Sequence, residues 1–189
     1  MSMINRTLRL GVLIAVLAFA TACSSVPVNQ DYDPAYDFSQ LGSYAWMERP
    51  PASGKPDLTD NQLVNSRVMK AFDDRMATKG HRLTSADQAS FLVTHYISVD
   101  KKIRVNTSNY GYGYGYRGYG GAGYSDTTVR QYEVGELILD FVSNDDDKKL
   151  LWRGTGSSKI QDKRTPEERQ QVITKVVDAV LKQFPPNTK

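Results

Sequence analysis

The segment RQYEVGELILDFVSNDDDKKLLWRG, residues 130–154, limits the architecture that this chain can adopt. Arg130–Val142 alternates as a half-buried strand does. Its apolar side chains divide between two faces, with Leu137, Leu139 and Phe141 on one and Ile138 and Val142 on the other. Asn144–Lys149 is typical of a turn, and Leu150–Gly154 begins a second strand that continues toward Ile160. Because a short turn joins neighbouring antiparallel strands, the segment predicts an antiparallel hairpin.

The region that follows, Thr165–Phe184, predicts the last helix. Thr165 and Glu168 have the spacing of a capping box, and Pro166 occupies the first helical position. Pro185 and Pro186 end the helix because proline lacks the N–H that a helix requires. The apolar residues of the helix form one stripe, which we expect to be buried: Val172, Ile173, Val176, Val177, Val180 and Phe184.

A first helix is predicted over Leu58–Lys79. Thr59 or Asp60 is a suitable N-cap, and Gly80 occupies the position of a left-handed C-terminal cap. Apolar residues recur at every fourth position and form a stripe that is typical of a core face: Val64, Val68, Phe72 and Met76.

Two further strands complete the expected fold. Ser43–Met47 places Tyr44 and Trp46 on one face, and Ser90–Val105 is apolar at its start and then alternates. The order of elements is therefore β-α-β-β-β-α. We expect an α+β domain with a mostly antiparallel sheet of about four strands and two helices packed on one face.

The N-terminus has the pattern of an export signal. Met1–Leu10 carries Arg6 and Arg9 without an acidic residue, and Leu10–Ala22 is uncharged. This apolar run is shorter than the roughly 20 residues that a spanning helix needs. The order of charge, apolar run and small residues predicts a signal peptide over residues 1–22.

Cys23 is the only cysteine in the chain and follows Ala20-Thr21-Ala22, which resembles a lipobox. The resemblance implies cleavage before Cys23 and lipid attachment to its thiol; the alternative is an ordinary signal with Cys23 as a bystander. Ser24 follows, and in Gram-negative lipoproteins a serine there favours transfer to the outer membrane. We therefore expect a lipid-anchored protein on the periplasmic face of the outer membrane, with residues 23–30 as a tether and residues 31–187 as the domain.

Composition limits the partners and cofactors. The chain has 24 basic and 21 acidic side chains, and removal of residues 1–22 would remove two of the basic ones. A nearly neutral mature chain lacks the basic footprint of a nucleic-acid-binding protein. His81 and His95 are the only histidines, so the sequence predicts no transition-metal site and no cofactor. The partners we expect are the membrane and an envelope protein or glycan; the sequence does not indicate an oligomeric state.

The segment NYGYGYGYRGYGGAGY, residues 109–124, holds six of the 11 tyrosines and seven of the 14 glycines. Its G-x-G-x-x-G matches do not predict a dinucleotide site, because no helix is expected after them. One interpretation is a flexible connection between strands. The other is a partner-binding loop, because tyrosines spaced by glycine can stack on sugars or pack on proteins at little entropic cost. Its tyrosines are Tyr110, Tyr112, Tyr114, Tyr116, Tyr119 and Tyr124.

No pattern of catalytic residues stands out. The sequence has no nucleophile-elbow motif, and Asp145–Asp147 lacks the glycine and glutamate of an EF-hand loop. We expect these acids to form a solvated turn. The leading hypothesis is a non-enzymatic binding or scaffolding protein of the cell envelope. The alternatives are a periplasmic hydrolase with His95 as its base, and a carrier of a small ligand in an enclosed apolar pocket.

Several segments together are similar to one family. They are Asp31-Tyr32-Asp33, Asp37-Phe38, Tyr44-Ala45-Trp46, Gly135-Glu136-Leu137, Leu151-Trp152-Arg153-Gly154 and Phe184-Pro185-Pro186. In this order the segments resemble the DUF4136 family of bacterial lipoproteins, whose function is unknown. The resemblance implies an envelope lipoprotein with an α+β domain and supplies no catalytic residues. Ser90 departs from the pattern, because many members have aspartate before the following strand.

Overall fold

The computed structural model describes residues 25–47, 61–110, 124–161 and 163–187, without the side chains of residues 107–110 and 124–126. These residues form six strands, two α-helices and one short 3-10 helix. In chain order they are β1 (Val28–Tyr32), η1 (Phe38–Gln40), β2 (Ser43–Trp46), α2 (Gln62–Thr78), β3 (Arg82–Leu83), β4 (Phe91–Tyr110), β5 (Tyr124–Ser143), β6 (Leu150–Lys159) and α3 (Pro166–Leu181).

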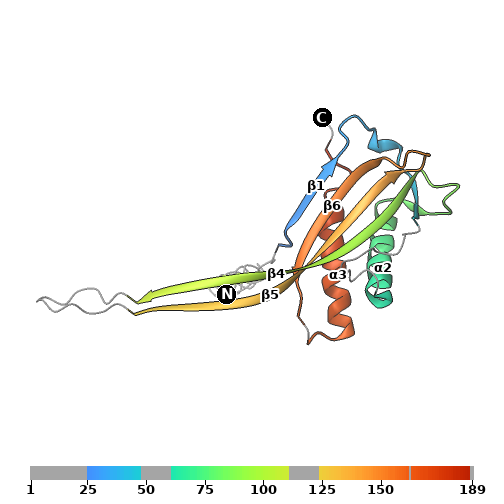
Figure 1. The fold of residues 1–189 in the computed structure, drawn as a ribbon. Coiled ribbons are helices and arrows are strands. Elements are labelled where there is room, and N and C mark those ends of the chain that lie inside the picture. Colours follow the sequence, from blue (N-terminus) through green and yellow to red (C-terminus); the bar gives the residue numbers. More distant parts are fainter. Residues whose placement is uncertain (1–24, 48–60, 111–123, 162, 188–189) are drawn as a thin grey trace, which may run out of the picture.

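The strands form one mixed sheet in the order β1-β6-β5-β4-β2-β3. The pairs β1–β6, β6–β5 and β5–β4 are antiparallel, whereas β2 runs parallel to both β4 and β3. Figure 1 shows α2 and α3 on the same side of this sheet. The predicted α+β class with two helices is confirmed, but the prediction of about four mostly antiparallel strands is wrong, because the sheet is mixed and has six.

Both extra strands lie at edges of the sheet. The interpretation of Ser24–Gln30 as a tether missed the start of β1, whose first three residues pair with Gly154–Gly156 of β6. Val28, Asn29 and Asp31 are exposed there, so no alternation of buried residues marks the strand. β3 is only two residues long and is exposed. Such edge strands depend on pairing with distant residues, which local patterns do not encode.

The core lies between the helices and the sheet. The side chains that fill it are Val68, Phe72 and Met76 from α2, Val176, Val177, Val180 and Leu181 from α3, and Phe91, Val93, Leu139, Phe141 and Trp152 from the sheet. Asp73 links α2 to β2, because its Oδ1 accepts hydrogen bonds from Tyr44 Oη at 2.8 Å and Trp46 Nε1 at 3.0 Å. The predicted helical stripes are therefore core faces.

The helix ends follow local sequence signals with two shifts, one of which is that α3 ends at Leu181 rather than at Phe184. Thr165 and Glu168 form the predicted capping box of α3, and Gly80 has the expected positive φ, +86°. The N-cap of α2 is Asn61, which accepts from the backbone N–H of Leu63 and Val64, rather than Thr59 or Asp60, which lie outside the described residues.

The turn between β5 and β6 also has the predicted character. Asp145–Asp147 are exposed, and the Asp145 carboxylate accepts from Ser143 Oγ at 2.7 Å and from the Lys148 N–H at 3.1 Å. These hydrogen bonds lower the pKa of Asp145. The acid therefore stabilises the turn.

Candidate functional site

The most unusual feature of the fold is a projecting β-ribbon. β4 and β5 pair without interruption from Phe91 opposite Ser143 to Tyr110 opposite Tyr124. β6 covers β5 only from Val134 to Val142, and β2 covers only the first three residues of β4. We call the part of the hairpin beyond this cover, Lys101–Tyr110 with Tyr124–Glu133, the arm. Figure 1 shows it extending away from the helices as two strands.

The arm has two chemically different faces, because directly paired residues share a face and alternate along the strands. One face exposes three aliphatic side chains: Ile103 at 61%, Val105 at 57% and Val129 at 59%. Val105 and Val129 are directly opposite each other. The other face carries Arg104 opposite Arg130. Like charges in that position repel each other, so the basic face is suited to an anionic partner.

The structure places only part of the predicted site. Cys23 and Ser24 lie outside the described residues, as do Tyr112, Tyr114, Tyr116 and Tyr119. Tyr110 and Tyr124 form the last pair of the arm, so both predicted strands were too short and the predicted loop began too early. The predicted strands cover only the base of the arm, up to Val105 on β4 and from Arg130 on β5. The arm's signal is the run Lys101–Ser108 (KKIRVNTS), in which one alternating face is entirely polar and the other is only partly apolar.

Both histidines are packed against aromatic side chains. His95 is 4% exposed and its ring lies 5.5 Å from that of Trp46. His81 packs against the ring of Phe184 at 5.7 Å, and burial lowers its pKa. Within the described residues, no group of three or more His, Cys, Asp or Glu side chains is placed to hold a metal ion. The described helices include none that is long and apolar enough to cross a membrane.

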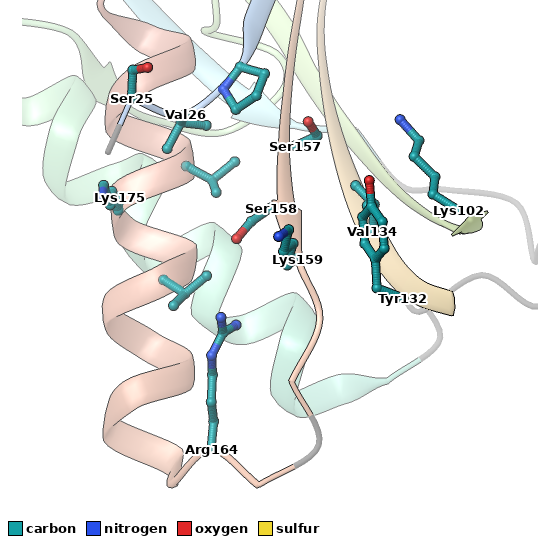
Figure 2. A pocket seen from close by; sticks show the side chains of 13 residues that line it. Ser25, Val26, Lys102, Tyr132, Val134, Ser157, Ser158, Lys159, Arg164 and Lys175 are labelled. Atoms are coloured by element: carbon teal, nitrogen blue, oxygen red, sulfur yellow. The ribbon is translucent and has the colours of Figure 1, made fainter. Parts of the chain in front are cut away.

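A large basic cleft lies beside the base of the arm and has a volume of about 520 Å³. Its cationic lining comes from four elements or segments: Lys102 of β4, Lys159 of β6, Arg164 before α3 and Lys175 of α3. Lys159 lies over the ring of Tyr132, with its Nζ 5.0 Å from the ring centroid. None of the described residues that line the cleft is acidic. Figure 2 shows Arg164 extending along the space between α3 and the end of β6, toward Ser158.

A smaller apolar crevice of about 150 Å³ opens between α2, α3 and the sheet. Aliphatic side chains line most of it: Val64, Val68, Ile97, Leu137, Ile160, Val172, Ile173 and Val176. Its cationic residues are Arg67, Lys159, Arg164 and Arg169. The basic cleft and the apolar crevice are adjacent, because both are lined by Ser158, Lys159, Arg164, Val172 and Val176.

Comparison with known proteins identifies a family but no activity. The model of a domain of unknown function, DUF4136, matches residues 28–186. No curated protein matches the chain.

Two kinds of solved structure are similar in fold. A crystal structure of a PDZ domain protein from Parabacteroides distasonis has a TM-score of 0.55 at 10% identity, over 87% of this chain and 36% of that one. This chain therefore spans about a third of that protein, and the likeness concerns the fold alone. Structures of a PelC dodecamer from Paraburkholderia phytofirmans have a TM-score of 0.42 at 12% identity, over 82% of this chain and 94% of that one.

Proposed function

We propose a function from one premise: this chain belongs to the DUF4136 family, whose model matches residues 28–186. On that premise, the protein is a non-enzymatic binding or scaffolding lipoprotein, anchored through Cys23 to the periplasmic face of the outer membrane. The arm is its contact surface for an envelope protein. The observation that carries this proposal is a β-ribbon that leaves the sheet with aliphatic side chains exposed on one face.

The sequence before the fold supports the anchor. Residues 1–22 have the order of an export signal, and Cys23 is the chain's only cysteine. β1 begins at Val28 and is held to β6 by backbone pairing. Lipid on Cys23 would therefore keep the domain close to the membrane surface, because only a few residues separate the anchor from the sheet.

The energetics of the arm support its role in binding. A two-stranded ribbon is only marginally stable by itself in water, and the arm, 10 residues long on β4, extends about 35 Å at roughly 3.4 Å per residue. Both of its edges lack a neighbouring strand among the described residues. A partner segment that adds as a strand would pair the free backbone groups and cover Ile103, Val105 and Val129.

The charge of the arm selects the partner's chemistry. Lys102, Arg104 and Arg130 share one face, and Arg104 faces Arg130 across the strands. A partner segment with acidic side chains would relieve this repulsion, whereas a second copy of the arm would add to it. The partner that fits is therefore an envelope protein with an extended, acidic segment that carries apolar residues at alternate positions.

In-cell photocrosslinking tests this contact. A photoreactive amino acid replaces Ile103, Val105 or Val129 on the aliphatic face, and Asp74 on the exposed side of α2 serves as the control position. We expect the same partner protein to be crosslinked from all three arm positions and not from position 74. The double substitution Arg104→Glu and Arg130→Glu should reduce the yield at least tenfold, because it repels an acidic segment.

Two results would contradict the proposed contact. One is that position 74 is crosslinked to the same proteins as the arm positions, since that indicates random collisions. The other is crosslinking only between copies of this chain, unchanged by the charge reversal, which would make the arm a self-association surface.

A further inference from the structure

We infer that the basic cleft and the apolar crevice together bind an anionic amphiphile, a hydrocarbon chain that ends in a phosphate or carboxylate group. The acyl or alkyl chain occupies the crevice, and the anionic head lies in the cleft near Arg164. This site uses the helices, the sheet and two residues at the base of the arm, Lys102 and Tyr132, and it does not depend on the rest of the arm or on its partner.

The crevice has the size and lining of a site for a hydrocarbon chain. Val68, Ile97 and Leu137 at its floor belong to the buried core, so the opening reaches the interior of the domain. An apolar cavity of about 150 Å³ stays dry and accepts a molecule the size of benzene. The crevice has the same volume, so it accommodates about six carbons of a chain.

A glycine makes room for this chain. Gly135 of β5 lines the crevice, between positions that carry larger side chains on neighbouring strands. A Cβ placed on it would lie 3.6 Å from Ile160 Cδ1, which is an ordinary contact distance. The Cβ itself would therefore fit at this position, and the further atoms of a larger residue would extend into the crevice.

The cationic rim selects an anionic head. Among the described residues, the Arg164 guanidinium has no carboxylate partner. The cleft adds Lys102, Lys159 and Lys175, and no described acid lines it. A desolvated phosphate or carboxylate is the complement of such a surface.

The position of the two cavities allows one ligand to occupy both, with its head in the cleft and its chain in the crevice. Arg164, Ser158 and Lys159 line both cavities, so they lie where the chain meets the head. Figure 2 shows the side chains of Ser158 and Arg164 in the space between β6 and α3. The Ser158 hydroxyl supplies a hydrogen-bond donor, and the guanidinium can bind two oxygens of a phosphate at once.

Calorimetric titration of the full chain with Cys23→Ala tests this inference. The ligands are decyl phosphate below its micelle concentration, butyl phosphate, inorganic phosphate, and decyl maltoside as a neutral amphiphile. Each buried methylene group contributes a factor of about four to affinity. We therefore expect decyl phosphate to bind at least tenfold more tightly than butyl phosphate, and more tightly than the two ligands that lack the chain or the charge.

Two variants locate the ligand, each with a matched control. Arg164→Gln should weaken decyl phosphate binding about tenfold, whereas Arg82→Gln on the far edge strand β3 should not. Gly135→Val should reduce decyl phosphate binding by at least tenfold and leave the melting temperature unlowered, because valine fits the strand. Gly42→Ala, whose added Cβ meets nothing within 4 Å, is its control.

The outcomes separate the alternatives. Equal binding of decyl maltoside and decyl phosphate, or unchanged affinity in a folded Gly135→Val variant, would overturn the inference. Vesicles of phosphatidylglycerol and of phosphatidylcholine then identify the source of the ligand. If the protein floats with the phosphatidylglycerol vesicles, and Arg164→Gln weakens this flotation, the ligand is a membrane lipid. If the protein binds decyl phosphate but neither kind of vesicle, the ligand is a free amphiphile.

Discussion

His81 shows how one buried side chain links the stability of this fold to pH. Its ring packs on Phe184 at 5.7 Å, and its Nδ1 is buried without a hydrogen-bond partner among the described residues. Burial lowers the pKa of His81 below its ordinary value of 6.5; a backbone hydrogen bond with Leu41 opposes this shift in part, and the charge of Lys79 adds the smallest effect by lowering the pKa further. The folded protein therefore holds this imidazole neutral.

We predict a loss of stability on acidification that His81→Gln reduces. Below pH 6.5 the unfolded chain binds a proton at this position more readily than the folded protein does, so the free energy of unfolding falls as the pH decreases. Urea denaturation at pH 7.5, 6.5 and 5.5 measures this slope. A slope that is identical in the wild type and in His81→Gln would show that other groups cause it.

At the scale of secondary-structure elements, the contact between α3 and β6 depends on two glycines. Gly154 and Gly156 leave space for the helix, because a Cβ on Gly156 would lie 2.6 Å from Val180 Cγ2 and 3.1 Å from Val176 Cγ1. Larger residues there would push α3 away from the sheet, and with it the side of the crevice that Val172 and Val176 form.

We predict that Gly156→Ala destabilises the protein by about 1–3 kcal/mol, the usual cost of overpacking a core. Denaturant unfolding measures this change, with Gly42→Ala as a neutral control. The double variant Gly156→Ala and Val180→Ala should be destabilised by less than the sum of the two single variants, because Val180→Ala removes the methyl group that the new Cβ meets. Strictly additive costs in the double variant would contradict this explanation.

The arm is also a separable element. Replacing residues 103–131 with Asn-Gly would close β4 and β5 with a two-residue turn between Lys102 and Tyr132, which pair directly. We expect cooperative unfolding with a melting temperature within about 4 °C of the wild type, a change below about 1 kcal/mol, because the buried core residues all lie outside the segment removed. Loss of cooperative unfolding would mean that the arm stabilises the domain.

The elements differ in how far the sequence predicts them. The capping box of Thr165 and Glu168 and the stripe ending at Phe184 specify α3 locally, and the short turn after Ser143 specifies the β5–β6 hairpin. β1 was missed because its stability comes from pairing with β6. Only the base of the arm was predicted, because apolar alternation ends at Val105 and the rest of the arm has no buried face. The crevice depends on tertiary packing that brings Val64, Leu137 and Val172 together.

At the scale of the whole molecule, the short tether connects the anchor to the arm. Only Ser24–Pro27 separate Cys23 from β1, and five extended Cα-to-Cα steps span at most about 18 Å. An arm of about 35 Å is longer than this tether. A lipid on Cys23 would thus restrict the domain to the membrane surface while the arm reaches a partner at some distance, which raises the effective concentration of the arm near an envelope protein.

We therefore predict that Cys23→Ala affects both location and binding. The variant should move from the membrane fraction to the soluble fraction after cell fractionation, and its labelling with a clickable palmitate analogue should disappear. Photocrosslinking from Val105 should fall at least tenfold at equal expression, because the partner then meets the arm only by free diffusion. Cys23→Ala that remains in the membrane fraction would show that another segment holds the protein there. A soluble Cys23→Ala variant with undiminished crosslinking would instead show that the arm binds its partner independently of the anchor. In that case, a 20-residue Gly-Ser insertion after Ser24 in the lipidated protein would leave the crosslinking yield unchanged, whereas we expect the insertion to lower it.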